Sequence, residues 1–206
     1  MRGWLCFAAF GIPVSVRVTR LYTDQFFTDV TAFASHARTV PLAVASDGSQ
    51  FTDSLTIVEE LAQRHPEACL LPADPQQRAH ARALMAEMHS SFTNLRADCP
   101  MNTRAAYAKT PISEEVEKDL RRLEQLWQTR KGTWLFGEHY SAADAFFAPV
   151  AARIAGYALP VTKKARAYVE AHLHHLPFRQ FRAWGQTFAS QSFYLRDYAV
   201  AEWPGP

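Results

Sequence analysis

The sequence lacks the features that would tie it to nucleic acid, to a metal or to a disulfide framework. Its 22 basic and 20 acidic residues give a formal charge of +2 and are mixed along the chain, so no basic stripe for nucleic acid stands out. Cys6, Cys69 and Cys99 have neither CxxC nor Cys/His spacing, which favours a reducing compartment. The histidines within residues 172–175 have no cysteine or carboxylate at ligand spacing, so we expect no metal site.

A long apolar run is also missing. The opening stretch MRGWLCFAAFGIP holds seven largely apolar residues, Trp4 to Phe10, behind a single arginine, and no small-x-small cleavage pattern precedes Pro13. Such a run is too short to span a bilayer and differs from a secretory signal. We therefore expect a cytoplasmic protein without membrane association, whose first residues form a buried helix that ends at Gly11.

Helix-like and strand-like patterns alternate up to about residue 70. Valine alternates with polar residues over residues 14–18, which predicts a strand. An Asp-Gly-Ser turn at residues 47–49 separates two short apolar runs, which predicts a hairpin. With 48% hydrophobic residues the chain can bury a core. The remaining expected elements are a helix over residues 23–35, strands over 40–44 and 50–52, and a helix over 55–65.

A proline-bracketed connector at residues 71–76 marks a change in pattern. No strand-period run of any strength follows it. The expected organisation is a mixed α/β domain over residues 1–70, a linker over 71–76 and an all-helical bundle over 77–206. The helices expected in the bundle are a long one over residues 76–95, two that begin after Ser113 and at Ser141, and two over residues 163–174 and 177–190.

This order of parts resembles the glutathione S-transferase family. The segment Arg38-Thr39-Val40-Pro41 resembles the family's xVP element, in which a cis-proline lets the preceding valine offer its backbone N–H and C=O to the cysteinyl part of glutathione. Asp53-Ser54 resembles the acidic residue and serine that hold the γ-glutamyl end. The resemblance implies a thioredoxin-like N-terminal domain that binds glutathione, as cosubstrate, through Thr39, Val40, Pro41, Asp53 and Ser54.

Physical arguments support such a site beside the resemblance. Ser54 stands just before an apolar helix, so its hydroxyl and the first N–H groups of the helix can receive a carboxylate. Asp53 can accept hydrogen bonds from an ammonium, and a tripeptide can pair with a strand edge at Val40. The alternative is that Ser54 is only an N-cap and Pro41 only an edge-strand proline.

Two segments of the bundle carry further resemblance. Residues 137–144, GEHYSAAD, resemble the family's G-x-x-x-S-x-A-D folding motif, whose role is structural. Residues 70–102 resemble a bacterial branch of the family akin to the zeta class. Met88, His89 and Phe92 form a possible substrate pocket for an apolar electrophile, although such a histidine is often only a satisfied interface residue.

The catalytic residue is unknown. Residues 2–13, RGWLCFAAFGIP, resemble the helix that in this family follows the first strand and its catalytic Ser, Tyr or Cys. The first strand and that residue are therefore expected before Met1, and the thioredoxin-like domain is interpreted as lacking its first strand. Within the chain, Ser15, Cys6 and Tyr22 are poor substitutes, because they lie on an outward strand position, inside a helix and too far along the sequence.

The resemblance implies a homodimeric glutathione S-transferase. Its reaction is expected to be the conjugation of glutathione to a hydrophobic electrophile, or the use of glutathione in an isomerisation. A second hypothesis is a non-catalytic glutathione- or protein-binding module of the same fold. A glutathione-dependent oxidoreductase is a weaker reading, because it needs a positioned cysteine. The identity of the electrophile is beyond the sequence.

Overall fold

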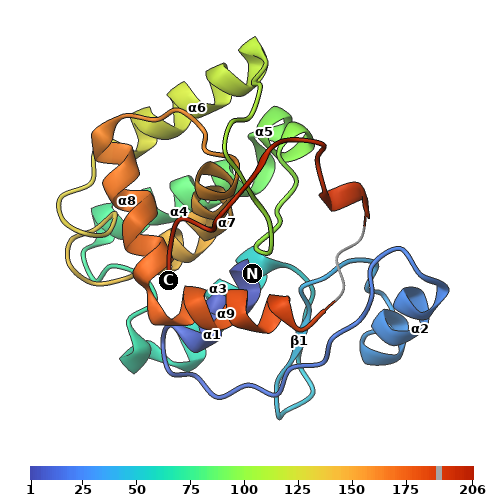
Figure 1. The fold of residues 1–206 in the computed structure, drawn as a ribbon. Helices are drawn as coiled ribbons and strands as arrows, with labels where there is room; N and C mark the ends of the chain where they lie inside the picture. Colours follow the sequence, from blue (N-terminus) through green and yellow to red (C-terminus); the bar gives the residue numbers. More distant parts are fainter. Residues whose placement is uncertain (189–191) are drawn as a thin grey trace. The chain divides into compact units, whose positions relative to one another are not determined.

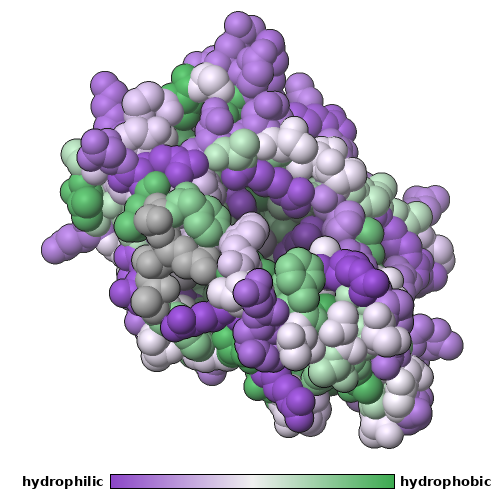
Figure 2. All heavy atoms as spheres, turned by 90° about the vertical axis from the view of Figure 1, so that its right-hand side faces the viewer, coloured by the Kyte–Doolittle hydropathy of each residue, from purple (hydrophilic) through white to green (hydrophobic). Residues whose placement is uncertain are grey.

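The computed structural model describes residues 1–188 and 192–206, and the chain divides into two compact units (Figure 1). The first unit is Arg2–Leu70 and the second contains Leu71–Pro206. Within the described residues no helix combines the length and the apolar character that a membrane crossing needs. On the face drawn in Figure 2, hydrophobic residues lie in separate groups among hydrophilic ones.

The first unit contains three helices and one hairpin. Its hairpin is antiparallel and pairs Ala43 with Phe51 and Val44 with Gln50. The expected helices and hairpin are present, with shorter strands than the sequence suggested. The elements are α1 (Arg2–Ala8), α2 (Asp24–Phe33), β1 (Ala43–Val44), β2 (Gln50–Phe51), α3 (Ser54–Arg64) and the 3-10 turn η1 (Pro66–Ala68).

The strand expected over residues 14–18 is not formed, and that prediction was wrong. Val14, Val16 and Val18 are 44%, 45% and 51% exposed, and residues 12–20 have no regular secondary structure. A strand needs a neighbour for its backbone hydrogen bonds. In the described part of the chain β1 and β2 pair only with each other. Residues 14–18 therefore have no neighbouring strand with which to form backbone hydrogen bonds.

The first unit buries α1 and one face of α2. Leu5 and Cys6 of α1 are fully buried, as expected for an apolar first helix, and α1 packs against α3. Phe26 and Val30 of α2 form a cluster with Ala34 and Ala37, and Leu42 packs against it. The chain that leads into β1 is therefore anchored to α2.

The second unit is a helical bundle built around α7. All but one of the residues of this helix are buried, as expected for a helix that is apolar on every side. It packs against both α4 and α8. The helices are α4 (Pro75–Ser90), α5 (Thr93–Asp98), α6 (Glu114–Trp127), α7 (Ala142–Gly156), α8 (Lys163–His174) and α9 (Leu176–Gln186).

The expected capping box at the start of α7 is present. Asp144 accepts hydrogen bonds from the backbone N–H of Ser141 at 2.8 Å and from its hydroxyl at 2.6 Å. Its other oxygen accepts from the N–H of Leu135 at 3.0 Å and from the hydroxyl of Tyr168 at 2.7 Å. Burial raises the pKa of Asp144, and these hydrogen bonds oppose that shift. The motif joins α7, α8 and the preceding loop.

Two details of the bundle differ from the sequence predictions. The helix expected over residues 76–95 is divided, because Phe92 adopts a left-handed conformation with φ 60° between α4 and α5. The bundle also contains two two-residue strands, β3 (Ala106–Tyr107) and β4 (Val200–Ala201), which pair antiparallel. The 3-10 turn η2 (Ser192–Tyr194) precedes β4.

The last expected helix is also shorter than predicted. The sequence predicts it over residues 177–190, whereas α9 ends at Gln186 with Thr187 as its cap. Ala189 and Ser190, at the end of the expected helix, lie outside the described residues.

Candidate functional site

The chain before β1 has the conformation that the resemblance implies. The Val40–Pro41 peptide bond is cis. Val40 is 42% exposed, Thr39 is exposed as well, and no backbone hydrogen bond of Val40 occurs within the described residues. Because an extended peptide pairs through unpaired N–H and C=O groups, this segment has the groups that a peptide ligand needs.

Gly3 holds Pro41 in place, and sequence reasoning missed it. A Cβ at Gly3 would lie 2.9 Å from both Cβ and Cγ of Pro41, closer than packed carbon atoms approach. The absence of a side chain therefore lets α1 pack directly on the proline ring. Gly3 and Pro41 lie far apart in the sequence, so no local pattern signals their contact.

The start of α3 differs in detail from the sequence prediction. Asp53, and not Ser54, is the N-cap: its Oδ1 accepts a hydrogen bond from the N–H of Leu55 at 2.7 Å. Ser54 is the first residue of the helix and is fully buried. Its hydroxyl has no hydrogen-bond partner among the described residues. A buried hydroxyl without a partner costs roughly 1–3 kcal/mol, so an acceptor that reached it would gain that energy.

An arginine ties the hairpin to α3. The guanidinium of Arg64 donates to Asp47 at 2.8 Å and to Ser49 at 3.1 Å in the turn, and its Nε donates to Glu60 at 3.2 Å. The hydrogen bond from Arg64 is the main reason that the pKa of Asp47 is held well below its usual range. The same guanidinium lies 5.2 Å from the centre of the Phe51 ring. This clasp connects the segment after Pro41 with the helix that begins at Ser54.

The residues expected to form the substrate pocket lie together at the end of α4. Met88 and Phe92 are only 1% and 4% exposed, and His89 is half-buried. Of the three, only His89 offers substantial surface to a ligand. Phe92, three residues after His89, occupies the left-handed position between α4 and α5.

The structure supports none of the three residues considered as substitutes for the catalytic residue, Cys6, Ser15 and Tyr22. Cys6 is fully buried, and burial raises the pKa of its thiol to about 12, so the reactive thiolate is not formed at neutral pH. Ser15 is exposed within the segment that forms no strand. Tyr22 is 75% exposed. The catalytic residue remains unassigned.

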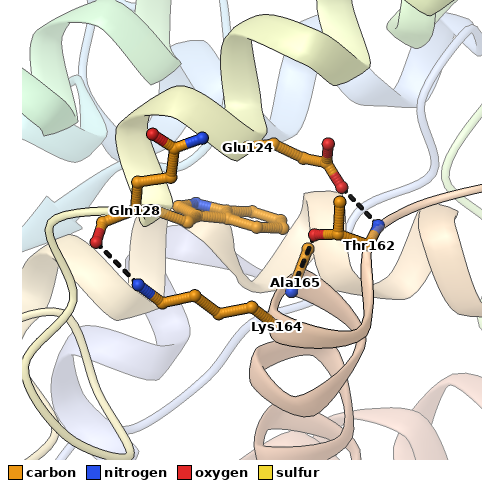
Figure 3. Close-up of a pocket in the computed structure, with 6 residues that line it drawn as sticks. Glu124, Gln128, Thr162, Lys164 and Ala165 are labelled. Atoms are coloured by element: carbon orange, nitrogen blue, oxygen red, sulfur yellow. Dashed lines mark hydrogen bonds between the residues drawn. The ribbon is translucent and has the colours of Figure 1, made fainter.

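A pocket on the second unit is separate from all of these residues (Figure 3). In Figure 3 its labelled side chains come from the end of α6 and the start of α8. The N–H of Thr162 donates to Glu124, and Nζ of Lys164 donates to the carbonyl of Gln128 at 2.8 Å. These hydrogen bonds join lining residues to one another, whereas Nε1 of Trp127 is buried and has no hydrogen-bond partner among the described residues. The lining residues of the pocket are Glu124, Trp127, Gln128, Thr162, Lys164 and Ala165.

Comparison with known proteins finds a family model for part of the chain. Residues 77–175, which run from α4 to the cap of α8, match the family model for the glutathione S-transferase C-terminal domain. This part of the chain is a glutathione S-transferase C-terminal domain. The chain has the two-part fold expected from the sequence, a thioredoxin-like first unit and a helical second unit.

The curated proteins that this chain resembles are maleylacetoacetate isomerases. A probable maleylacetoacetate isomerase of Caenorhabditis elegans is 35% identical over 118 residues, which are 55% of either chain. The maleylacetoacetate isomerase of Pseudomonas aeruginosa is 28% identical over 149 residues, 68% of this chain and 69% of the relative. The matched region thus spans about half of the first relative and about two thirds of the second.

A solved structure extends the likeness over both units. The maleylacetoacetate isomerase of Anaeromyxobacter dehalogenans, with dicarboxyethyl glutathione and citrate bound in its active site, superposes with a TM-score of 0.63. The comparison covers 86% of each chain at 22% sequence identity. At that identity the likeness concerns the fold.

Proposed function

We propose that this chain binds glutathione through Thr39, Val40, Pro41, Asp53 and Ser54 and acts as a glutathione S-transferase. The observation that carries the proposal is the buried hydroxyl of Ser54, which has no partner among the described residues and lies in the first turn of α3. The first N–H groups of a helix lack intrahelical acceptors and attract an anion. A glutathione carboxylate would satisfy both.

The segment before β1 supports the other half of this proposal. Val40 is an exposed residue whose backbone makes no hydrogen bond within the described residues, so it can provide one N–H and one C=O for the cysteinyl part of the tripeptide. Asp53 uses Oδ1 as the cap of α3, and its negative charge favours the ammonium of the γ-glutamyl end. Glutathione would then span from Val40 to the start of α3, all within the first unit.

The proposed chemistry is attack by the glutathione thiolate on an electrophilic carbon. A carbon–sulfur bond forms and the thiol proton is lost, so a group that stabilises the thiolate is required. In an isomerisation the thiolate adds, the substrate rotates about a single bond, and the thiolate leaves unchanged. Because the curated relatives are named isomerases, we favour isomerisation over conjugation. A homodimer in the cytoplasm remains part of the proposal.

The second candidate function is a binding module of the same fold. Its support is that three described residues fit thiol activation poorly, since Cys6 has a raised pKa and Ser15 and Tyr22 are exposed. The module would bind glutathione through the same residues without turning it over. Glutathione binding without turnover of a model electrophile would support this candidate, whereas turnover would support the enzyme.

Calorimetry with a Ser54→Ala variant tests the glutathione site. We expect the Kd for glutathione to rise about tenfold, equivalent to about 1.4 kcal/mol, because the hydrogen bond to the carboxylate is lost. Ser35→Ala is the matched control, since Ser35 is an exposed serine of the same unit. A Kd that is equal in wild type and Ser54→Ala would refute the assignment.

A further inference from the structure

The two halves of the proposed glutathione site are joined by a hairpin that is too short to be stable on its own. Val40–Pro41 precedes β1, and Asp53–Ser54 follows β2. Each strand has two residues, so the ladder contains two residue pairs. An isolated two-stranded hairpin is at best marginally stable in water. Contacts with other elements must therefore fix the spacing between the two halves of the site.

Arg64, the last residue of α3, makes such contacts with each nitrogen of its guanidinium. Nη1 donates to Oδ2 of Asp47 at 2.8 Å and Nη2 donates to the hydroxyl of Ser49 at 3.1 Å, both in the turn of the hairpin. Nε donates to Glu60, one turn earlier on α3, at 3.2 Å. The guanidinium also lies 5.2 Å from the centre of the Phe51 ring in β2. One side chain thus joins the turn and the second strand to α3.

The helix α3 supports both halves of the proposed site. Its first residue is Ser54, and Phe51, which is 7% exposed, lies two residues before its cap, Asp53. It also packs against α1, which contacts Pro41 at Gly3. The chain before the hairpin is therefore held through α1, whereas the hairpin itself is held through the last residue of α3.

Asp47 has two separate hydrogen bonds in the turn. Its Oδ1 accepts from the N–H of Ser49 at 2.9 Å, whereas its Oδ2 accepts from Arg64. An asparagine at this position keeps an oxygen for the N–H of Ser49 but has neither the charge nor the second oxygen. The substitution Asp47→Asn therefore removes the ion pair with Arg64 and leaves the closure of the turn intact.

We propose that Arg64 is a positioning residue of the glutathione site, because it holds the hairpin so that Val40 and the start of α3 keep the spacing that glutathione spans. The inference rests on the proposed function, in which the tripeptide reaches from Val40 to Ser54. Arg64 does not touch glutathione in this proposal. It acts through the turn and through Phe51, and all of these residues belong to the first unit.

The test measures the Kd for glutathione by calorimetry on the full chain, for wild type, Arg64→Met, Arg64→Lys and Asp47→Asn. Glutathione at neutral pH carries two carboxylates and one ammonium, so it is an anion. If Arg64 acted only through its charge, its loss would weaken binding, whereas loss of the Asp47 charge would strengthen it. If the contact between them positions the site, both substitutions weaken binding. Arg20→Met is the matched control, since Arg20 is an exposed arginine of the same unit.

For Arg64→Met and Asp47→Asn we expect the Kd to rise about threefold, because a partly exposed ion pair contributes modestly. Arg64→Lys should lie between these variants and wild type, since an ammonium keeps the charge but does not reproduce the planar fork of the guanidinium. Hydrogen exchange without ligand should accelerate over residues 43–53 in Arg64→Met. Arg20→Met should behave as wild type.

Other results overturn the proposal in distinguishable ways. An unchanged Kd in Arg64→Met removes the positioning role, and so does tighter binding by Asp47→Asn or equal weakening in Arg20→Met, which leave only an effect of charge. Faster exchange throughout the first unit shows that Arg64 is only structural. If Arg64→Met does not fold, Asp47→Asn decides the question. A wild type that does not bind glutathione refutes the proposed function itself.

Discussion

At Gly3 the helix α1 approaches Pro41 so closely that no side chain fits between them. An added Cβ would meet two carbon atoms of the proline ring at 2.9 Å, and both belong to a ring that cannot swing away. Pro41 follows Val40, whose exposed backbone is the proposed partner of the cysteinyl part of glutathione. A single missing methyl group in α1 therefore sets the position of a binding segment about forty residues further along the chain.

Replacing Gly3 by alanine should weaken glutathione binding. Alanine favours the helix by up to about 1 kcal/mol over glycine, so the protein should still fold. Because the new methyl group displaces Pro41, we expect the Kd for glutathione to rise about tenfold in calorimetry. A folded Gly3→Ala protein, as judged by circular dichroism, that binds glutathione like wild type would contradict this role.

The sequence was enough to nominate residues for the candidate site, but it did not predict their geometry. Asp53-Ser54 was recognised from its resemblance and from the helix that follows, because capping residues leave a local signal. Which of the two residues is the cap depends on where the first turn of α3 begins, and a shift of one position exchanges their roles. The contact between Gly3 and Pro41 joins segments far apart in sequence, so no local pattern contains it.

At the scale of elements, α8 carries a histidine that the fold keeps neutral. The ring of His172 meets the edges of Trp134, Tyr140 and Tyr168, with ring centres 5.1, 5.9 and 4.7 Å away. The side chain is fully buried, and neither ring nitrogen has a hydrogen-bond partner in the described part of the chain. Burial, with the nearby charges of His175 and Arg130, lowers its pKa to about 3.

The free energy of unfolding of the bundle should therefore decrease as the pH is lowered from 6.5 to about 3, because of His172. Unfolded His172 takes up a proton near pH 6.5, whereas the folded protein resists it until about pH 3. Below pH 6.5 the unfolded state thus binds more protons, and wild type should lose up to about 1.4 kcal/mol per pH unit relative to His172→Phe. Above pH 6.5 the difference between the two proteins should stay constant.

Urea unfolding of the two proteins at a series of pH values measures this difference. His174→Phe is the control, because His174 is exposed and its Nδ1 lies 2.9 Å from the carbonyl oxygen of Glu170. If the free energies of unfolding of wild type and His172→Phe changed equally between pH 3 and 6.5, the pH effect assigned to His172 would be contradicted.

The elements themselves were predictable where the signal is local. Periodic apolar residues with a cap, as at Ser113 and Ser141, predicted helices that are present. The valine alternation over residues 14–18 predicted a strand that is not formed, because strand formation needs a neighbouring strand. The break at Phe92 was missed, because it depends on Arg96 and Asp119, which reach it from other elements.

At the scale of the whole molecule, the proposed glutathione residues all belong to one of the two units. Arg2–Leu70 contains the segment before β1 and the start of α3, while His89 belongs to the unit that contains Leu71–Pro206. The proposed glutathione site is thus assigned to the first unit alone.

Glutathione should therefore protect one unit selectively. A ligand present at a hundred times its Kd stabilises the state that binds it by about 2.7 kcal/mol. We expect hydrogen exchange with saturating glutathione to slow over residues 39–58, with smaller changes in the bundle. Protection centred on residues 71–206 would place the ligand elsewhere, and oxidised glutathione at the same concentration serves as the comparison.

The pairing of β3 with β4 joins the C-terminal residues of the second unit to a buried segment near its middle. Ala106 pairs with Ala201 and Tyr107 with Val200, and the hydroxyl of Tyr107 accepts a hydrogen bond from the N–H of Arg196 at 2.9 Å. Contacts between residues so far apart form late, since the chain between them must first be available. During synthesis on a ribosome, which releases the chain from its N-terminus, the bundle can close this seam only after its last residues have emerged.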